Sequence, residues 1–429
     1  MSRDILIKGF IKTQGEVNKG YIVADVRAGI ITDLGLNKEF IGKFYGDIYE
    51  YGSGSTIEVG DFNAHSHPEQ SIYTDIVDKD WNLSTWCKNT IYKFSNNLEL
   101  KHIYLGCCRA FSRMLTLGVT SVMVSFYCHN NRGNIYDKEV IRAAKDVGIR
   151  LYYGRMNYDI ITIDAYEQKK LAQKSFYEMP SEAEGYFTEL LQSVNSPRIV
   201  IAPSIHSIHA STKEAIINAI NLGNKYNRYV QFHLSEDEGD VGMSLKLYGL
   251  RPVEFLSRLV ESGEVEKLDN LILSDCVWID DREREIIKQH NMKVVLNPRM
   301  NARIKTGEAD IVKLKGAGID LYLGTDGEAS NEDLSITGER CFLKNKFKEL
   351  GDKDIDNIGT TQIKFNEGFI GPICKGNFCD LKVTRKGVVE DVFVGGEKVV
   401  SNGKVITIAV ESKVERPLKK AVKELISKS

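Results

Sequence analysis

Two histidines near residue 65 have the types and the spacing of a metal-binding pair. Residues 61–67 read DFNAHSH, so His65 and His67 follow an apolar stretch typical of a short strand. Side chains alternate between the two faces of a strand, and both imidazoles would therefore point the same way, as two ligands of one ion must. An isolated His-x-His is also compatible with two structural histidines. Its position after an apolar strand favours the metal site.

A third histidine stands in a similar place further along the chain, and a carboxylate follows it. Residues 231–237 read QFHLSED, in which His233 ends an apolar run and Glu236 comes three residues later. Glu236 would already have left the strand and could fold over whatever His233 binds. A carboxylate that reaches a water molecule without binding the metal is what a general base requires. The alternative is a solvated acidic loop, because residues 236–240 carry four acids.

Asp326 is the third chemically suggestive position. It lies in residues 321–331, LYLGTDGEASN, after an apolar strand and between small residues that let other groups approach. Its carboxylate could bind a metal ion through one oxygen and accept a proton from a water molecule through the other. An Asp-Gly pair is also common in ordinary turns.

The middle of the chain predicts a fold that would bring these groups together. Short apolar segments alternate with stretches of helical period, and eight strands over about 250 residues predict a (β/α)8 barrel of the TIM type. An open doubly wound sheet is the alternative, but no Gly-x-Gly-x-x-Gly turn follows a strand. In a barrel, strands one, five and eight end at the same mouth. The expected strands are 57–62, 119–124, 150–153, 198–203, 229–233, 271–274, 293–297 and 320–325, and the expected helices include 104–117, 138–147, 212–226, 253–261 and 281–291.

Both ends of the chain are rich in short β segments with glycine-bearing turns. This texture predicts one small β-sandwich domain built from residues 1–58 together with 365–410. Residues 59–364 would then form the metal-dependent barrel, and residues 411–429 a charged amphipathic C-terminal helix. Two unrelated small sheets are the alternative to a shared domain.

The composition excludes several classes of function. Lys and Arg number 57 against 59 Asp and Glu, so the net charge is −2 and there is no basic excess for nucleic acid. No apolar run approaches the roughly 18 residues of a membrane span, and the first residues lack a signal-peptide pattern. Eight scattered cysteines without a Cys-x-x-Cys pair are expected to be free thiols. We therefore expect a cytoplasmic protein that has no nucleic-acid or membrane partner.

Three motifs make the chain similar to a known family. Residues 65–70, HSHPEQ, resemble a His-x-His-x-x-Gln segment, and residues 233–236, HLSE, resemble His-x-x-Glu. Residues 324–331, GTDGEASN, are close to Gly-Thr-Asp-Gly-x-Ala-Ser-Asn, and Trp86 falls where a Leu-x-x-Trp helix start is found. With these motifs the chain resembles the amidohydrolase superfamily, and within it the mononuclear branch of chlorohydrolases and of guanine-, cytosine- and adenosine-type deaminases.

The resemblance implies a metal centre and a reaction. It implies one divalent ion, Zn²⁺ with Fe²⁺ as the alternative, and a small-molecule substrate bound by a homodimer or homotetramer. An activated water would attack an sp² carbon of a cyclic amidine or nucleobase-like ring, and ammonia would leave. Glu236 would carry a proton to the ring nitrogen. The implied metal ligands are His65, His67, His233 and Asp326, and the implied substrate contacts are His206, with His209 second, and Gln70.

Several positions depart from the family pattern. Asp275 stands where a His normally follows strand six, and a carboxylate there would act only if protonated or paired. Trp278 and Val124 also replace a frequent His and Asp. Arg299 is an addition at the barrel mouth that could bind an anionic substrate group. Between residues 335 and 365 the family's helix is not recognisable, which predicts shortened final helices.

Two hypotheses therefore follow from the sequence. The first is a metal-dependent hydrolase of a carbon–nitrogen bond, in which Glu236, Asp326 and Asp275 are the catalytic carboxylates. The second is a barrel that keeps its metal but has altered or lost catalysis because of Asp275. The complete set of five motif residues favours the first, since a protein that no longer used the metal would have lost ligands at random.

Overall fold

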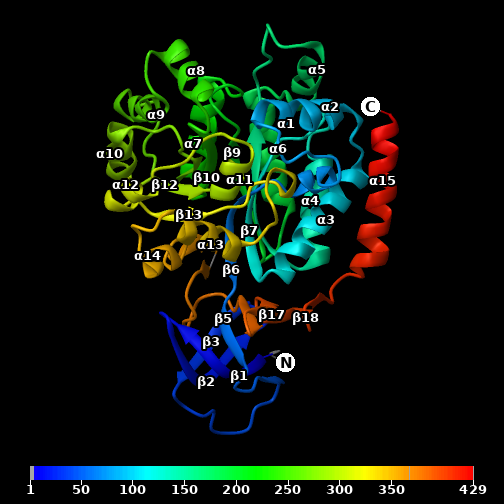
Figure 1. The fold of residues 1–429 in the computed structure, drawn as a ribbon, viewed down its shortest axis with the longest axis vertical. Helices are drawn as coiled ribbons and strands as arrows, with labels where there is room; N and C mark the ends of the chain where they lie inside the picture. The colour runs from blue at the N-terminus through cyan, green and yellow to red at the C-terminus, as the bar shows by residue number, and fades with distance from the viewer. Residues whose placement is uncertain (1–3, 367, 429) are drawn as a thin grey trace.

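Eight parallel strands form the predicted barrel (Figure 1). A computed structural model describes residues 4–366 and 368–428. The strands pair in chain order, and the backbone N–H groups of Thr325 and Asp326 both donate to the carbonyl oxygen of His65 at 3.1 Å, which joins the last strand to the first. The barrel strands are β6 (Asp61–Ser66), β7 (Val119–Phe126), β8 (Arg150–Asn157), β9 (Ile199–Ile205), β10 (Val230–Leu234), β11 (Leu271–Asp275), β12 (Lys293–Leu296) and β13 (Leu321–Leu323).

The inside of the barrel is a packed core. Inward-facing side chains such as Phe62, Met123 and Val295 form one buried cluster, and a larger cluster lies between the strands and the surrounding helices. The hairpin of β14 (Ile363–Phe365) and β15 (Gly368–Ile370) adds its apolar side chains to the inner cluster at the amino ends of the strands. Because the strands are buried on both faces, they read as continuous apolar runs. In barrels of this type the reactive side chains lie at the carboxyl ends of the strands.

Helices surround the barrel, and those predicted over five segments are found as α3, α4, α7, α9 and α10. The region after β13, where no family helix is recognisable in the sequence, also folds into two helices, one of eleven residues and one of five. The helices are α1 (Leu83–Asn89), α2 (Ile91–Phe94), α3 (Leu100–Thr116), α4 (Ile135–Val147), α5 (Glu167–Phe176), α6 (Pro180–Ser193), α7 (Lys213–Tyr226), α8 (Glu238–Tyr248), α9 (Pro252–Glu261), α10 (Asp281–Gln289), α11 (Pro298–Arg303), α12 (Ile311–Gly316), α13 (Ile336–Lys346) and α14 (Asp352–Asp356).

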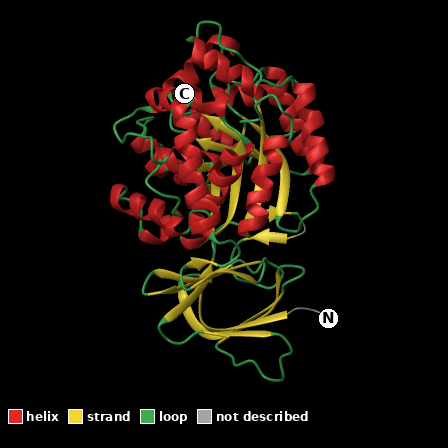
Figure 2. Cartoon of the chain, turned by 90° about the vertical axis from the view of Figure 1, so that its right-hand side faces the viewer, coloured by secondary structure: helices red, strands yellow, loops and turns green. Residues whose placement is uncertain are grey.

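Strands from both chain ends share one sheet below the barrel, as predicted. Figure 2 shows this sheet as a strongly curved layer, and its inner face holds a separate apolar cluster. Strand β5 from the first end pairs with β16 from the second. The division of the chain at residues 58/59 and 364/365 stays a prediction. The strands are β1 (Asp4–Thr13), β2 (Glu16–Asp25), β3 (Ile30–Leu36), β4 (Asp47–Glu50), β5 (Ser55–Val59), β16 (Leu381–Arg385), β17 (Val388–Val394), β18 (Glu397–Ser401) and β19 (Lys404–Val405).

The predicted first barrel strand, 57–62, spans two strands of the structure. Residues 57–59 end β5 in the lower sheet, and the barrel strand β6 begins only at Asp61. Gly60 joins them at a close approach, because a Cβ there would lie 2.2 Å from Cγ2 of Thr120. Its N–H donates to the carbonyl oxygen of Asp380 at 2.9 Å. The single strand predicted from sequence therefore contains a change of sheet.

The chain ends in a helix that packs on α3. A single π-helical turn, η4 (Glu411–Glu415), leads into α15 (Arg416–Ser427). The buried guanidinium of Arg109 in α3 donates to Glu415 at 2.7 Å, and Leu418 lies in the main core. Among the helices of residues 4–366 and 368–428, none combines the length and the hydropathy of a membrane span.

Candidate metal centre and active site

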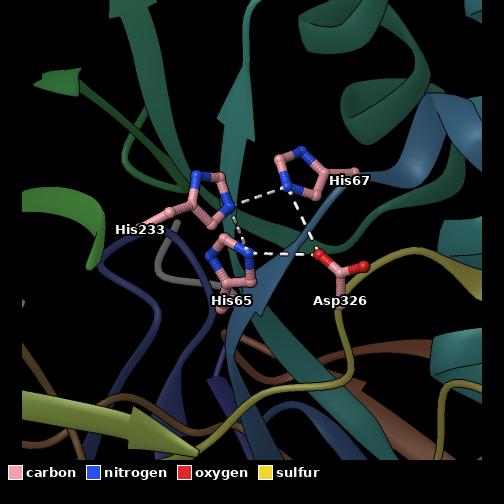
Figure 3. A group of neighbouring side chains, drawn as sticks. All are labelled: His65, His67, His233 and Asp326. Carbon is pink, nitrogen blue, oxygen red and sulfur yellow. Dashed lines mark hydrogen bonds and ion pairs between the residues drawn. The ribbon is translucent and has the colours of Figure 1, made fainter. Parts of the chain in front are cut away.

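Four side chains meet at the mouth of the barrel (Figure 3). The Nε2 atom of His233 lies 3.1 Å from the Nε2 atoms of both His65 and His67, and Oδ1 of Asp326 lies 3.3 Å from both of those nitrogens. All four ligand atoms fall within 4.8 Å of one another. The residues come from the ends of β6, β10 and β13, which the sequence predicted to converge.

The outer nitrogens of the three imidazoles explain why the inner ones fit a cation. Nδ1 of His67 donates to the carbonyl oxygen of Ser125 at 2.6 Å, and Nδ1 of His233 donates to that of His206 at 2.8 Å. Nδ1 of His65 faces Oε1 of Gln231 at 3.4 Å. With the protons on Nδ1, three Nε2 lone pairs point at one another beside a carboxylate. This arrangement is repulsive unless a positive ion lies between them.

Burial disfavours the charged form of two of these imidazoles. It lowers the pKa of His67 to about 4, and it lowers the pKa of His233 well below its ordinary value, with the other imidazoles adding to the effect. Burial alone would raise the pKa of Asp326, but its hydrogen bond with His65 and the neighbouring imidazoles hold it well below the usual range. Three neutral imidazoles and one carboxylate are a ligand set suited to a divalent metal such as zinc.

The backbone bends sharply where the strands deliver these groups. Ser235, Asp275 and Asp326 have φ values of 52°, 80° and 55°, in the left-handed region that favours glycine. Each follows or ends a barrel strand at the mouth. Backbone strain of this kind gathers at functional sites, where surrounding contacts hold a side chain in a required direction.

Glu236 lies beside the metal centre but is not one of its four convergent ligands. It follows Ser235 at the end of β10, and its side chain is partly exposed. Burial raises the pKa of Glu236 well above its ordinary value, and the charges of Asp275 and Asp326 add to the rise. The structure thus brings the expected proton carrier close to both carboxylates.

Asp275 is fully buried at the end of β11, the strand that pairs with β10. Its Oδ1 accepts hydrogen bonds from the side-chain amides of Asn297 at 2.9 Å and Asn301 at 3.2 Å. Its Oδ2 has no hydrogen-bond partner among the described residues. Burial raises the pKa of Asp275, although the His65 imidazole acts in the opposite direction. One oxygen is therefore held in place while the other is free to act.

The substrate contacts expected from sequence differ in their surroundings. The imidazole of His206 packs edge-on between Tyr127 and Tyr158, with ring centroids 4.8 and 5.0 Å away, and lies 5.4 Å from that of His233. Gln70 is buried, and its Oε1 has no hydrogen-bond partner among the described residues. Both side chains lie close to the metal ligands in space or sequence and carry polar atoms that a substrate could use.

Arg299 has partners inside the protein instead. Its Nε donates to Glu339 at 2.8 Å, and one terminal nitrogen donates to Asp333 at 2.6 Å and to the carbonyl oxygen of Ser335 at 3.1 Å. The residue is buried at the start of α11. Because its guanidinium already satisfies these acids, we do not include Arg299 among the proposed substrate contacts.

Gln231 also contacts the candidate site, although it is not among the residues predicted from sequence. It lies two residues before His233 in β10, donates through Nε2 to the carbonyl oxygen of Ala64, and so presents Oε1 to His65. It also accepts a hydrogen bond from the hydroxyl of Ser125, whose carbonyl oxygen holds His67. The same i, i+2 rule that pairs His65 with His67 could have found it.

Comparison with known proteins agrees with this geometry. The model of the amidohydrolase family matches residues 56–358. The 5′-deoxyadenosine deaminase of Methanocaldococcus jannaschii is 25% identical over 449 residues, covering 96% of this chain and 94% of that protein. The 5-methylthioadenosine/S-adenosylhomocysteine deaminase of Thermococcus sibiricus is 25% identical over 330 residues, covering 75% and 72%.

Solved structures show the same fold. A zinc-bound adenosine deaminase of Xanthomonas campestris superposes with a TM-score of 0.81 at 20% identity, covering 99% of this chain and 98% of that one. The atrazine chlorohydrolase of Arthrobacter aurescens, complexed with zinc, reaches 0.81 at 18% identity, covering 98% and 100%.

The chain belongs to the amidohydrolase family, because the family model covers well over half of it. The resemblance seen in the motifs is thereby confirmed. At this level the enzyme class is confirmed as well, a metal-dependent hydrolase of carbon–nitrogen bonds other than peptide bonds.

Proposed function

We propose that the protein removes an amino group from a nucleobase-like ring and releases ammonia, with adenosine-type nucleosides as the substrate class. The observation that carries this proposal is the convergence of His65, His67, His233 and Asp326 with Glu236 beside them. The names of the two deaminases described above support the choice of an aminopurine ring.

Each residue has a role that follows from its position. A divalent ion, Zn²⁺ with Fe²⁺ as the alternative, would supply a Lewis acid that activates a water molecule for attack on the ring carbon. Asp326 accepts the proton that the water loses, and Glu236 carries a proton to the ring nitrogen. His206, flanked by Tyr127 and Tyr158, orients the planar ring from the side.

Asp275 takes over the place of the usual strand-six imidazole. Asp275, which is fully buried, and Glu236, which is partly exposed, are neighbouring carboxyl groups at the ends of two paired strands. Two such groups share one proton more readily than they ionise together. The free Oδ2 of Asp275 can then donate or accept a hydrogen bond at the reacting centre, as an imidazole would.

A second candidate rests on the same residue. If the negative charge of Asp275 is not neutralised, the barrel binds a metal and a ligand without turnover. The buried, doubly hydrogen-bonded carboxylate is the observation that favours this alternative. Catalysis and binding can be separated experimentally.

The deciding experiment measures metal content and ammonia release with the purified protein. The panel is 5′-deoxyadenosine, methylthioadenosine, adenosine, guanine and a chlorinated triazine. We expect one metal ion per chain and turnover of at least one aminopurine. Asp275→Asn should lower kcat by about 10²-fold and leave metal content unchanged, because it removes a proton carrier and not a ligand.

The outcomes separate the two candidates. Stoichiometric metal without turnover of any panel member, in the wild type and in Asp275→His, would establish the non-catalytic alternative. Equal activity of Asp275→Asn and the wild type would remove Asp275 from the mechanism and keep the deaminase assignment.

We further propose that the protein works in the cytoplasm as a homodimer or homotetramer. All eight cysteines are free, five of them buried, which suits a reducing compartment. Light scattering coupled to size exclusion measures the oligomer directly. A monomeric mass at micromolar concentration would contradict this part of the proposal.

A further inference from the structure

A second polar pocket lies at the opposite end of the barrel from the metal centre. It has a volume of about 200 Å³ and is formed where the chain enters β10, β11 and β12. Tyr229 precedes β10 and Asn270 precedes β11, whereas His233 and Asp275 lie at the other ends of these strands. The pocket is therefore separated from the reacting groups by the length of the barrel.

The pocket gathers positive charge in a chain whose net charge is −2. Four cationic side chains border it and one acidic side chain, Asp269, does so. Asp269 is already paired with Lys267 at 3.2 Å. The cations are Arg228, Lys267, Lys293 and Lys364.

Lys293 is the most informative of these cations. The residue is 93% buried, yet within the described part of the chain its ammonium group makes only long contacts, 3.4 Å to the carbonyl oxygen of Asp269 and 3.5 Å to that of Asn291. The ring of Tyr229 lies below it at 5.2 Å. Burial lowers the pKa of Lys293, although Asp320 and Asp269 act in the opposite direction. A buried ammonium group with such weak partners is costly unless an anion binds it.

Three buried polar atoms around the same pocket also lack partners among the described residues. They are Nε of Arg228, Oδ1 of Asn224 and Oδ1 of Asn270, and Asn270 is 92% buried. The amide nitrogens of the two asparagines already donate to the carbonyl oxygens of Lys267 and Ile220 at 3.1 and 3.3 Å, so their oxygens stay available as acceptors. The pocket thus offers cationic donors together with two neutral acceptors.

We propose that this pocket binds a small anion of the phosphate type that carries hydroxyl groups. Arg228 and Lys293 bind the anionic oxygens, and the amide oxygens of Asn224 and Asn270 accept hydrogen bonds from the hydroxyls. Sulfate offers the charge without the hydroxyl donors. Inorganic phosphate and a phosphorylated small metabolite share the required chemistry, and the volume admits either group.

The test is calorimetric titration of the full-length, metal-loaded protein with sodium phosphate at constant ionic strength and pH 7. We expect saturable binding of one phosphate per chain with a Kd of about 0.1–1 mM. Sulfate should bind about tenfold more weakly, because two amide oxygens would then lose their partners. Ribose 5-phosphate is the third ligand and represents phosphorylated metabolites. If it binds more tightly than inorganic phosphate, the natural ligand is a phosphorylated metabolite; if inorganic phosphate binds more tightly, the natural ligand is phosphate itself.

Variants assign the binding to the pocket. Lys293→Met and Arg228→Met should each weaken phosphate binding about tenfold or more, and Lys293→Met preserves the length of a buried side chain, so that folding is retained. Lys225→Met is the matched control, because Lys225 lies on α7 next to Asn224 but does not border the pocket. His233→Ala, which removes a proposed metal ligand, should leave phosphate binding unchanged.

Three results would overturn the proposal. They are the absence of saturable phosphate binding in the wild type, an equal loss in Lys225→Met and Lys293→Met, and loss of binding in His233→Ala. The second would indicate diffuse attraction and the third would assign the phosphate to the metal centre. Equal affinity for sulfate and phosphate would overturn the role of the two asparagines.

Discussion

At the amino ends of β6 and β8, buried charged groups meet opposite charges, whereas at the carboxyl ends of β6, β10 and β13 groups of the same kind face one another. Arg150 in β8 donates two hydrogen bonds to Asp380, at 2.6 and 2.9 Å, and Asp61 in β6 accepts from Lys382 at 2.7 Å. At the other end, Nε2 of His233 lies 3.1 Å from Nε2 of both His65 and His67.

This difference distinguishes charged groups that stabilise the fold from polar groups that are available to bind a ligand. Paired charges join the barrel to the lower sheet, because Lys382 and Asp380 belong to or adjoin β16. At the mouth, several buried polar atoms have no partner among the described residues, and such atoms cost stability unless a ligand or water satisfies them. They are Glu69 Oε2, Gln70 Oε1, Ser235 Oγ, Asp275 Oδ2 and Asn297 Oδ1.

Removing one imidazole at the mouth is expected to have the largest effect. His233→Ala should reduce the metal content from one ion per chain to less than about a tenth. It should lower kcat/KM by more than about 10⁴-fold, because the Lewis acid is lost with the metal. Metal content is measured by mass spectrometry. His290→Ala removes a partly exposed imidazole at the end of α10 and should change neither quantity; retained metal in His233→Ala would refute the proposed ligand set.

The next effect concerns the carboxylate beside the metal. Glu236→Gln keeps the size of the side chain but removes its ability to carry a proton, so kcat should fall by about 10²–10⁴-fold at unchanged metal content. Steady-state ammonia release gives kcat and KM separately. The matched control is Glu238→Gln, two residues further along and exposed. Full activity of Glu236→Gln would place the proton carrier elsewhere.

At the amino ends, removal of one partner should affect folding and not chemistry. Arg150 is 1% exposed and its guanidinium lies 3.6 Å above the ring of Phe378. Arg150→Met leaves Asp380 buried and unpaired, and should lower the free energy of unfolding by about 3–5 kcal/mol. Urea denaturation measures this. Arg142→Met, which removes an exposed pair with Glu139, should cost less than about 1 kcal/mol.

The double variant Arg150→Met/Asp380→Leu sharpens the test. It removes both charges and should be more stable than Arg150→Met alone. Metal content should be normal in every one of these variants. Loss of metal in Arg150→Met at temperatures where the protein remains folded would contradict the conclusion that the charge pairs at the amino ends act on folding alone.

The convergence of the four candidate metal ligands could be predicted from sequence because they stand at the ends of three strands, where local alternation decides the direction of each side chain. His65 and His67 needed only the period of a strand, and His233 and Asp326 needed the barrel that the strand count predicts. Partners that are remote in sequence were not predictable in this way. From sequence alone, Arg299 is a candidate substrate contact. The structure shows that its guanidinium instead donates to Glu339, which lies forty residues later in the chain.

The hydrogen-bond partners of Asp275 were also not predictable, because they are remote in sequence. Its type and position were visible, and a carboxylate there was expected to act only if protonated or paired. The two asparagine amides that hold Oδ1 and leave Oδ2 free come from the segment after β12, and no local pattern connects Asn301 with residue 275. Burial, which depends on the whole fold, is the first cause of the shift.

The smallest expected effect is a pH dependence at the amino ends. Burial alone would raise the pKa of Asp61, but the charges and hydrogen bonds of Lys382 and Arg340 hold it below its ordinary value. The unfolded chain therefore takes up a proton at higher pH than the folded protein does. The stabilisation from Asp61 is complete above the ordinary pKa of about 3.9 and is lost as pH falls towards the folded value.

Asp61→Asn should consequently be less stable than the wild type by about 1.5–3 kcal/mol at pH 7, the contribution of hydrogen bonds to a charged group. Below about pH 4 the difference should shrink, because the wild-type carboxylate loses its charge advantage there. Urea denaturation of both proteins between pH 3 and 7 measures the gap. A gap that is constant across this range would mean that Asp61 contributes by shape and not by charge. In that case the pairing of Asp61 with opposite charges would not explain its contribution to stability, and the contrast with the mouth would not extend to Asp61.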